Sequence, residues 1–341
     1  MAQIDKPSLH FNTKLYTGNG STQSITGVGF QPDWCWLKNR SSNGYDNRTY
    51  DSVRTATKLL NTNLTNVEGT DAQGLTAFGT DGFTVGTSNG DNNNGDNYVS
   101  WNWKANGAGS ANTDGSINST VSANTTAGFS IVSYTGTGAN ATVGHGLGVA
   151  PKLLILKSRT RSDGQWTVGS DMLGWSKFLY LDANSAEQTF NLYQNTAPTS
   201  SVFYLSGDGG VNQSGGNMIG YAFAEKTGYS KFGTYTGNGN ADGTFIYTGF
   251  KPAFVMNKKT DGTMDWHIWD NKRNSFNVID KLVYPNLSNG EDTLTSLDFV
   301  SNGFKIRDNR NFLNASGSPY IYMAFAEAPL VGQNNVPCTA R

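Results

Sequence analysis

The histidines are the first residues to consider for catalysis, and the chain has only three. His145 lies in the glycine-flanked turn Gly144-His145-Gly146, where its imidazole could contact a ligand. No Gly-x-Ser-x-Gly elbow or His-x-x-x-His pair, the patterns typical of hydrolases and zinc sites, accompanies any of the three. We therefore predict no catalytic residue. His145 is kept as a candidate ligand-binding residue, with an exposed structural turn as the alternative.

Carboxylates are the second source of chemistry, because a pair of them drives glycoside hydrolysis and can converge from distant strands. Five acidic residues recur at related places in the chain: Asp51, Asp171 and Asp270, and Glu225 with Glu327. Recurrence indicates a structural role. Each of the three aspartates is interpreted as an Asx turn with an exposed charge pair, worth at most about 1 kcal/mol. The protein is predicted not to be an enzyme.

Metal and cofactor sites are also not predicted. The run from Asp91 to Asn97 resembles a calcium loop, but its glycine is one position early and Asn102 stands where a bidentate glutamate should be. Cys35 and Cys338 have neither metal-ligand spacing nor enough partners for a disulfide framework. We expect no cofactor and no bound metal.

Tryptophans beside polar groups are the remaining candidates, because sugar rings pack on flat aromatic faces while their hydroxyls need hydrogen bonds. Trp175 and Trp269 are the candidate surface residues for such a ligand. Trp166 and Trp266 both precede a recurring aspartate and are interpreted as core residues.

The composition argues against nucleic-acid-binding and membrane-spanning proteins and favours one fold class. The 341 residues carry a net charge of −1, and 25 basic residues face 26 acidic ones, so no basic surface for nucleic acid is expected. No apolar run approaches the ~20 residues that span a bilayer, and the N-terminus does not resemble a signal peptide. Abundant Gly, Asn, Ser and Thr with 12% aromatic residues favour an all-β fold of short strands and turns.

Internal repeats predict the elements that would position these residues. The string Tyr-Thr-Gly-x-Gly begins at Tyr16, Tyr134 and Tyr235. Each copy is followed by a proline, an apolar run and a lysine six residues after the proline, at Lys38, Lys157 and Lys258. Each copy ends on an aromatic segment, at 98–103, 218–223 and 320–325. The short apolar runs indicate strands buried on both faces, which places Cys35 in a core.

The near-constant spacing of these motifs predicts three tandem β-sandwich repeats of the lectin or jelly-roll type, about 95 residues each. The predicted boundaries are 11–105 for repeat one, 106–128 for a linker hairpin rich in Ser, Thr, Asn and Gly, 129–226 for repeat two, 232–327 for repeat three and 328–341 for an extended tail.

Two stretches of the chain, residues 11–34 and 128–151, resemble a repeat family of virion structural proteins of tailed bacteriophages, particularly marine ones. The resemblance covers essentially the whole chain, repeat by repeat. It implies a tail-fibre-like component of the virion, assembled in the host cytoplasm, and brings no catalytic or binding residues with it. Fibres often carry a long N-terminal adaptor, whereas here the first repeat begins by residue 11.

We therefore expect a bacteriophage virion structural protein, tail-fibre-like or tail-associated, that is displayed on the particle and contacts host surface glycans. The expected partners are other virion proteins and further copies of the chain, a trimer being one form. The alternative is a capsid decoration protein, for which residues 328–341 would be the anchor. A polysaccharide-degrading enzyme is the least favoured hypothesis.

Overall fold

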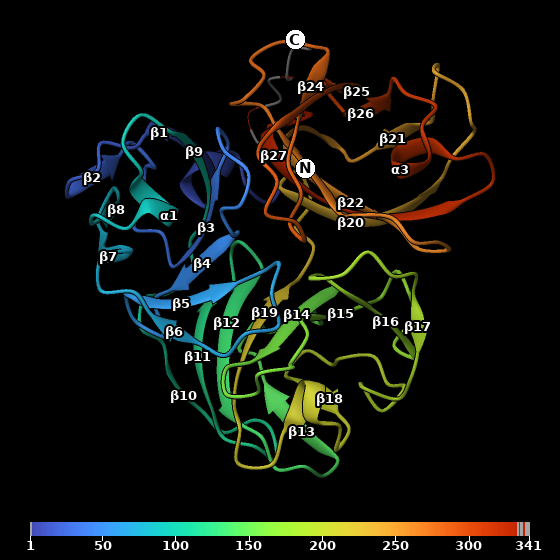
Figure 1. Ribbon diagram of the computed structural model, residues 1–341. Helices are drawn as coiled ribbons and strands as arrows, with labels where there is room; N and C mark the ends of the chain where they lie inside the picture. The colour runs from blue at the N-terminus through green and yellow to red at the C-terminus, as the bar shows by residue number, and fades with distance from the viewer. Residues whose placement is uncertain (1, 333, 335–336, 338–341) are drawn as a thin grey trace.

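The computed structural model describes residues 2–332, 334 and 337, and its strands fall into three consecutive segments (Figure 1). The first segment, residues 7–103, is blue and teal in the figure; the second, 110–223, is green to yellow; the third, 230–329, is orange to red. The first segment contains η1 (Pro7–Leu9), β1 (Phe11–Thr17), β2 (Gln23–Thr26), β3 (Trp34–Asn39), β4 (Arg48–Asp51), β5 (Lys58–Asn61), β6 (Gly69–Thr70), β7 (Leu75–Gly79), β8 (Gly82–Val85), α1 (Asn89–Asn92) and β9 (Asn97–Trp103).

The second segment contains β10 (Ser110–Asn112), β11 (Ser119–Asn124), β12 (Phe129–Thr135), β13 (Ala141–Gly144), β14 (Leu153–Ser158), β15 (Thr167–Ser170), β16 (Lys177–Tyr180), β17 (Gln188–Thr189), β18 (Val202–Leu205), α2 (Gly209–Asn212) and β19 (Asn217–Phe223). The third contains β20 (Ser230–Thr236), β21 (Phe245–Tyr247), β22 (Phe250–Lys259), β23 (His267–Asp270), β24 (Ile279–Leu282), β25 (Asp292–Val300), β26 (Gly303–Ile306), α3 (Asn311–Asn314) and β27 (Pro319–Pro329).

In the described part of the chain these strands form six sheets. Three of them, called the inner sheets here, have the orders β1-β9-β3-β4-β5-β6, β10-β11-β12-β19-β14-β15-β16-β17 and β20-β27-β22-β23. The outer sheets have the orders β2-β8-β7, β13-β18 and β21-β26-β25-β24. Each segment packs one inner sheet on one outer sheet, so the predicted all-β sandwich fold is confirmed.

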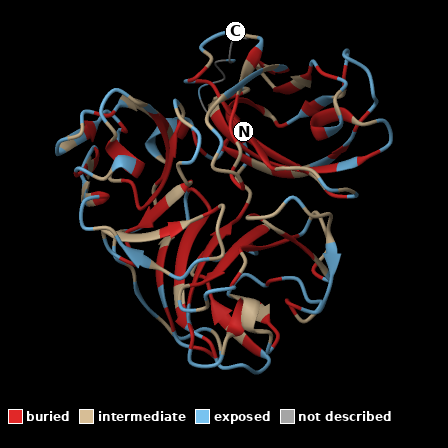
Figure 2. Cartoon of the chain, viewed as in Figure 1, coloured by how far each residue is buried: buried red, intermediate tan, exposed pale blue. Residues whose placement is uncertain are grey.

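The apolar run after each proline forms a strand buried on both faces, as predicted. In β3, Trp34 and Trp36 face one group of core residues, while Cys35 and Leu37 face another beneath the outer sheet. Strands β14 and β22 alternate in the same way. Figure 2 shows these strands as the buried interior of the molecule, with the exposed residues concentrated in the connecting loops.

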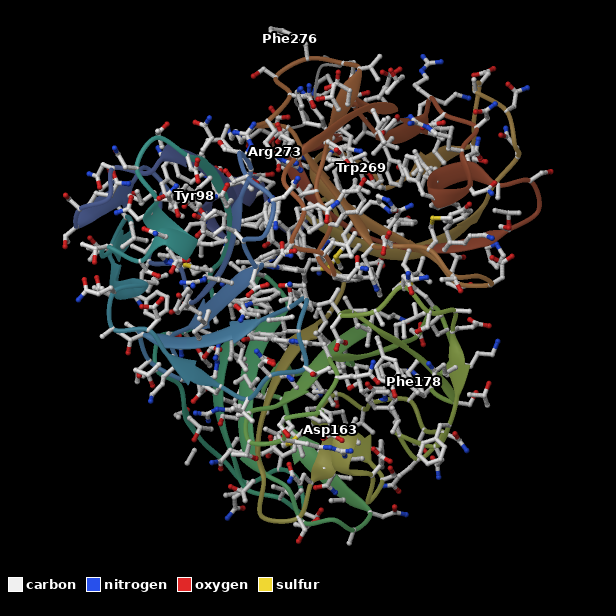
Figure 3. All side chains as sticks on the ribbon, in the orientation of Figure 1. Tyr98, Asp163, Phe178, Trp269, Arg273 and Phe276 are labelled. Carbon is white, nitrogen blue, oxygen red and sulfur yellow. The ribbon has the colours of Figure 1, made fainter. Side chains whose placement is uncertain are left out.

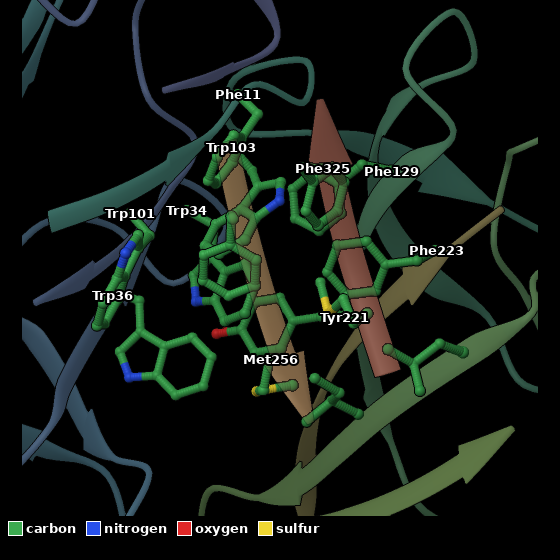
Figure 4. Packing of buried hydrophobic residues seen from close by; sticks show 14 of the residues in the cluster. Phe11, Trp34, Trp36, Trp101, Trp103, Phe129, Tyr221, Phe223, Met256 and Phe325 are labelled. Carbon is green, nitrogen blue, oxygen red and sulfur yellow. The ribbon is translucent and has the colours of Figure 1, made fainter. Parts of the chain in front are cut away.

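The inner faces of all three inner sheets meet in one hydrophobic core (Figure 4). Trp34 stacks on Tyr221 of the second segment, with 4.3 Å between ring centroids. Phe11 stacks on Phe325 of the third segment at 5.0 Å, and Phe325 lies 6.1 Å from Phe223 of the second. The division into three separate sandwich repeats stays a prediction, whereas this shared core belongs to the whole chain.

Partly buried hydrogen bonds link the segments in a closed ring. In each segment a side-chain N–H donates to a backbone carbonyl of another segment: Trp166 to Asn61 at 2.9 Å, Trp266 to Tyr180 at 2.9 Å, and Asn47 to Tyr284 at 3.0 Å. The second segment therefore bonds the first, the third bonds the second, and the first bonds the third. Trp166 and Trp266 are core residues, as predicted.

Two of the recurring aspartates form buried ion pairs, so the predicted exposed charge pair is wrong for them. Asp51 binds Arg54 at 2.5 Å and Asp270 binds Arg273 at 2.6 Å, and all four side chains are fully buried. Each carboxylate also accepts a hydrogen bond from another segment, Asp51 from the Tyr221 hydroxyl and Asp270 from the Trp101 indole. These turns are interior because the second segment covers the turn at Asp51 and the first segment covers the turn at Asp270.

The third recurring aspartate does not occupy the corresponding position. In the strand ladders Asp51 pairs with Trp34, and the residue that pairs with the corresponding Leu153 is Ser170, one position before Asp171. Ser170 keeps the turn by accepting a bond from the Leu173 amide. Asp171 instead forms a surface ion pair with Lys152, and both side chains are nearly half exposed.

Residues 106–128 and the C-terminal end both contribute to sheets. Strands β10 and β11 pair with each other, and β11 pairs with β12 along its whole length, so they extend the second inner sheet. Residues 328 and 329 continue β27 against β22. Cys35 is buried in the core, and Cys338 lies outside the described residues.

Candidate functional site

His145 is buried, which excludes the predicted exposed turn and any direct contact with a ligand in this conformation. Its Nδ1 accepts a hydrogen bond from the Leu147 amide at 3.2 Å, so the ring proton lies on Nε2 and is donated to the Thr199 carbonyl at 3.2 Å. Burial lowers the pKa of His145, which favours this neutral form. Its role is to hold a turn.

The two candidate tryptophans are also core residues. Trp175 is 6% exposed and packs edge-to-face on Tyr193 beneath the second outer sheet. Trp269, labelled in Figure 3, is fully buried beside His267 and Phe312 of the third segment. Neither ring has a free face for a sugar, so the predicted ligand role does not fit these positions. Both fill space between an inner and an outer sheet.

A polar pocket of about 170 Å³ lies elsewhere in the second segment, between β15, β16 and α2. Asp163, which lines it, is labelled in Figure 3. Polar side chains converge on the pocket from two connections and two strands, and Leu192 of a third connection forms an apolar wall. They are Arg161, Asp163, Gln165, Thr167, Tyr180 and Asp208.

The pocket exists because Thr167 stands where both other segments carry larger residues, and because Gly210 stands where the third segment carries a phenylalanine. Thr167 pairs with the residue five positions after the proline of its segment, Leu156, as Arg48 and His267 do with the corresponding residues of the first and third segments. Gly210 is the second residue of α2, where α3 has Phe312 and α1 has a glycine. Neither Thr167 nor Gly210 has the volume to fill the space.

The corresponding volume of the first segment is filled by Arg48. A Cβ added to Gly90 would come within 2.0 Å of the guanidinium carbon, so the Arg48 side chain lies directly on α1. Arg48 is held there by Asp71 at 2.7 Å and Asp91 at 3.0 Å. In the third segment the rings of His267 and Phe312 pack 4.6 Å apart and close the same volume.

Charge is unevenly distributed around the pocket. Arg161 holds Asp163 through two hydrogen bonds, of 2.5 and 3.0 Å, and these lower the pKa of Asp163. Asp208 accepts a bond from the Gly210 amide at 2.7 Å. Partial burial, and then the negative charge of Asp208, raises the pKa of Tyr180, so its hydroxyl stays protonated and can donate.

This arrangement is suited to binding a small polyhydroxylated molecule. Carboxylate, amide and hydroxyl groups of Asp208, Gln165 and Thr167 supply acceptors and donors, and Tyr180 adds an aromatic surface. Among the residues that the structure describes, no group of three or more His, Cys, Asp or Glu could hold a metal ion. The site is small, of the order of one sugar ring.

Sequence patterns did not identify this site, because it is created by missing volume. The available signal was the contrast at matched positions, where Thr167 replaces Arg48 and His267 and Gly210 replaces Phe312. Polar residues such as Asp163 and Asp208 lie in loops, and no motif singles them out.

No helix within the described residues is long and apolar enough to cross a membrane. Comparison with curated proteins and with solved structures finds no match. A family model does match, over residues 6–329, and the match includes all three inner sheets and the polar pocket. The chain therefore belongs to the family described as a domain of unknown function, DUF7483.

Proposed function

We propose that the protein is a bacteriophage virion structural protein, displayed on the particle, that contacts a host surface glycan through the polar pocket of the second segment. The virion assignment rests on the resemblance of residues 11–34 and 128–151 to phage structural repeats. The observation that carries the glycan contact is the pocket itself, open in one segment and filled at the corresponding places of the other two.

The lining favours recognition over turnover. A glycosidase needs one carboxylic acid with a raised pKa to protonate the leaving group. In this pocket the Arg161 guanidinium holds the pKa of Asp163 below its usual value, so Asp163 stays ionised and serves as an acceptor for sugar hydroxyls. A single shallow site would bind one sugar weakly, and display of many copies on a particle would raise the avidity.

The test is glycan-array binding by the purified protein and by the Gly210→Phe variant. Phenylalanine at this position copies Phe312 of α3 and fills the pocket, and Gly210 has an ordinary backbone conformation with no backbone atom near an added Cβ. We expect the variant to lose binding at least tenfold while its melting temperature changes little. The control is Tyr247→Ala, which removes an aromatic side chain that is 59% exposed in the third segment and should bind normally.

Two outcomes contradict the proposal. Equal binding by the Gly210→Phe variant would move the glycan site away from the pocket, and absence of binding to any bacterial surface glycan would remove the glycan contact altogether. The position on the particle is tested separately, with gold-labelled antibody on intact virions. Gold at the tail is the expected result, whereas gold spread over the head would indicate a capsid decoration protein.

A further inference from the structure

The outer edge of strand β1 borders a groove of about 300 Å³ at the junction of the first and third segments. Its lining comes from four consecutive residues of β1, from the turn after β2 and from the turn after β23. The lining residues are Asn12, Thr13, Lys14, Leu15, Gly27 and Lys272. Strand β1 is the edge strand of the first inner sheet, so the groove lies along an unpaired edge.

The hydrogen-bond ladder shows which backbone groups face this groove. His10 accepts from Lys104, and Gly18 donates to Asp96, so the even-numbered residues of β1 bond to β9. Because bonded and non-bonded pairs alternate in antiparallel sheets, the N–H and C=O groups of Thr13 and Leu15 point away from β9. They offer an incoming strand two donors and two acceptors.

The second segment already holds a strand at the corresponding edge. Strand β12 occupies the place of β1 in the shared sheet order, and its outer edge is covered by β11. Ile131 and Ser133, which correspond to Thr13 and Leu15, pair with Ser122 and Thr120 of β11. The chain itself therefore demonstrates an antiparallel strand seated on this edge.

The third segment protects its corresponding edge with internal charge pairs. Glu225 lies beside β20, where it binds Lys231 at 2.7 Å and accepts a long bond from the Phe232 amide. A second groove lies along β20, and Lys152 and Asp171 of the second segment, which form an ion pair, line it together with Glu225 and Lys231. The lysines of the β1 groove differ, because no carboxylate of the described chain lies within ion-pair distance of Lys14 or Lys272.

One buried polar atom in the β1 groove also has no hydrogen-bond partner among the described residues. Thr13 is 4% exposed, and its Oγ1 is buried and unsatisfied. A buried hydroxyl without a partner costs free energy, and a neighbouring chain could supply that partner. The groove thus combines free edge amides, an unsatisfied hydroxyl and two lysines that form no ion pair with a described residue, although Asp81 acts on Lys14 from a longer distance.

We propose that the β1 edge binds an extended, acidic peptide segment of a partner protein as an added antiparallel strand. The backbone of the segment pairs with Thr13 and Leu15, and its carboxylates meet Lys14 and Lys272. This interaction is independent of the glycan contact, since the pocket lies in the second segment and shares no residue with the groove.

The experiment is hydrogen–deuterium exchange of the full chain with two synthetic capped peptides. The acidic peptide has the β11 sequence STVSAN with both serines replaced by aspartate, and the control peptide has lysines there instead. We expect the acidic peptide to slow exchange of the Thr13 and Leu15 amides about tenfold or more, without changing exchange in β20. The lysine peptide should give no protection.

Matched proline variants test the register. Leu15→Pro removes an outward-facing N–H and leaves the β9 ladder intact, which an edge strand tolerates, and it should abolish protection of the Thr13 amide. Thr234→Pro is the control on β20, where it removes the corresponding N–H and should leave protection at β1 unchanged. If Leu15→Pro lowers the melting temperature, the Lys14→Glu, Lys272→Glu double variant replaces it and should weaken binding of the acidic peptide at least tenfold.

Several outcomes overturn the proposal. Protection by both peptides alike, or by neither, would exclude an acidic strand at this edge. Retained protection of Thr13 in the Leu15→Pro variant would place the peptide elsewhere. Protection of β1 that grows with protein concentration in the absence of peptide would identify a second copy of the chain as the occupant.

Discussion

At the scale of single residues, the most consequential side chains are buried charges that bridge segments. Asp51 pairs with Arg54, Arg54 reaches Glu68 at 3.3 Å, and Glu68 binds Arg159 of the second segment through two bonds of 2.8 Å. Breaking a buried pair leaves a desolvated charge, whereas replacing both partners by matched uncharged residues is often nearly neutral. The second segment has made that replacement, with Ser170 and Leu173.

The difference between the first and second segments predicts that two variants at Asp51 lose different amounts of stability. Asp51→Ala should lower the free energy of unfolding by about 3–5 kcal/mol, because Arg54 stays buried without its carboxylate. The Asp51→Ser, Arg54→Leu double variant copies Ser170 and Leu173, keeps the turn bond and should cost less than about 2 kcal/mol. Urea unfolding of both variants measures the difference. Equal losses in the two variants would show that the unpaired charge of Arg54 does not cause the destabilisation.

The recurring lysines are a second set of buried charges. Lys38, Lys157 and Lys258 are fully buried, and burial lowers the pKa of each to about 8. Their ammonium groups donate to backbone carbonyls, as Lys157 does to Thr65 of the first segment at 2.7 Å. The sequence pattern located these lysines by their distance from a proline, and their burial explains why the position recurs.

Stability should therefore depend on pH in the alkaline range. Above pH 8 the folded chain has released these protons, while the unfolded chain holds them up to its ordinary lysine pKa near 10.5. Because the unfolded state binds more protons, the free energy of unfolding should rise from pH 8 to 10, by at most about 1.4 kcal/mol per pH unit per lysine.

Above pH 10 the sign reverses, because buried tyrosines such as Tyr98, with its pKa raised to about 12, keep protons that the unfolded chain loses. Chemical denaturation across pH 7–11 tests this profile. Lys157→Met should flatten the rise by about a third, since one of three equivalent groups is removed. A wild-type profile that falls steadily from pH 8 would contradict it.

At the scale of elements, the Tyr-Thr-Gly-x-Gly turn packs against a one-turn helix. In the second segment the Tyr134 hydroxyl donates to the Val211 carbonyl at 2.6 Å, and the buried Asn212 side chain bonds to the turn. A Cβ on Gly136 would lie 2.2 Å from the Gln213 carbonyl oxygen. This close approach of two backbones is the reason that the turn requires glycine there.

Gly136→Ala should consequently destabilise the protein by more than about 2 kcal/mol, since neither backbone can move without losing these bonds. Gly148→Ala is the matched control: it has a positive φ of +70° but open space around an added Cβ. The control should cost only the conformational term, about 1–2 kcal/mol. Equilibrium unfolding compares the two, and a smaller loss for Gly136→Ala would refute the packing explanation.

These elements also show which features the sequence could predict and which it could not. Turns and doubly buried strands have local signatures, and the repeated motifs placed them well. The alignment of Asp171 with Asp51 and Asp270 was wrong by one residue. Ser170 occupies the corresponding position in the second segment, and Asp171 is the residue after it. The pocket depends on Thr167 and Gly210, which meet only in the fold, and alternation along a strand cannot say what covers its second face.

At the scale of the whole molecule, the second face of each inner sheet is covered by the other two segments. A lone sandwich would expose inner-face residues such as Trp34 and Phe325 to water. The ring of bonds from Trp166, Trp266 and Asn47 has no free end, so removing any segment leaves unpaired groups on both others. The covered faces also need no partner subunit, which makes oligomer formation independent of this core.

The shared core predicts a single cooperative unfolding transition for the chain. Calorimetry, tryptophan fluorescence and far-ultraviolet circular dichroism should give one coincident midpoint, whereas three independent sandwiches would melt separately. Trp34→Ala, which removes a first-segment ring stacked on Tyr221, should cost about 3–5 kcal/mol and lower this transition as a whole. Exchange protection in β22 of the third segment should fall by the same free energy, because its amides open only in the global transition. If β22 kept its protection while the first segment melted early, the three segments would be separate folding units and the core between them an interface.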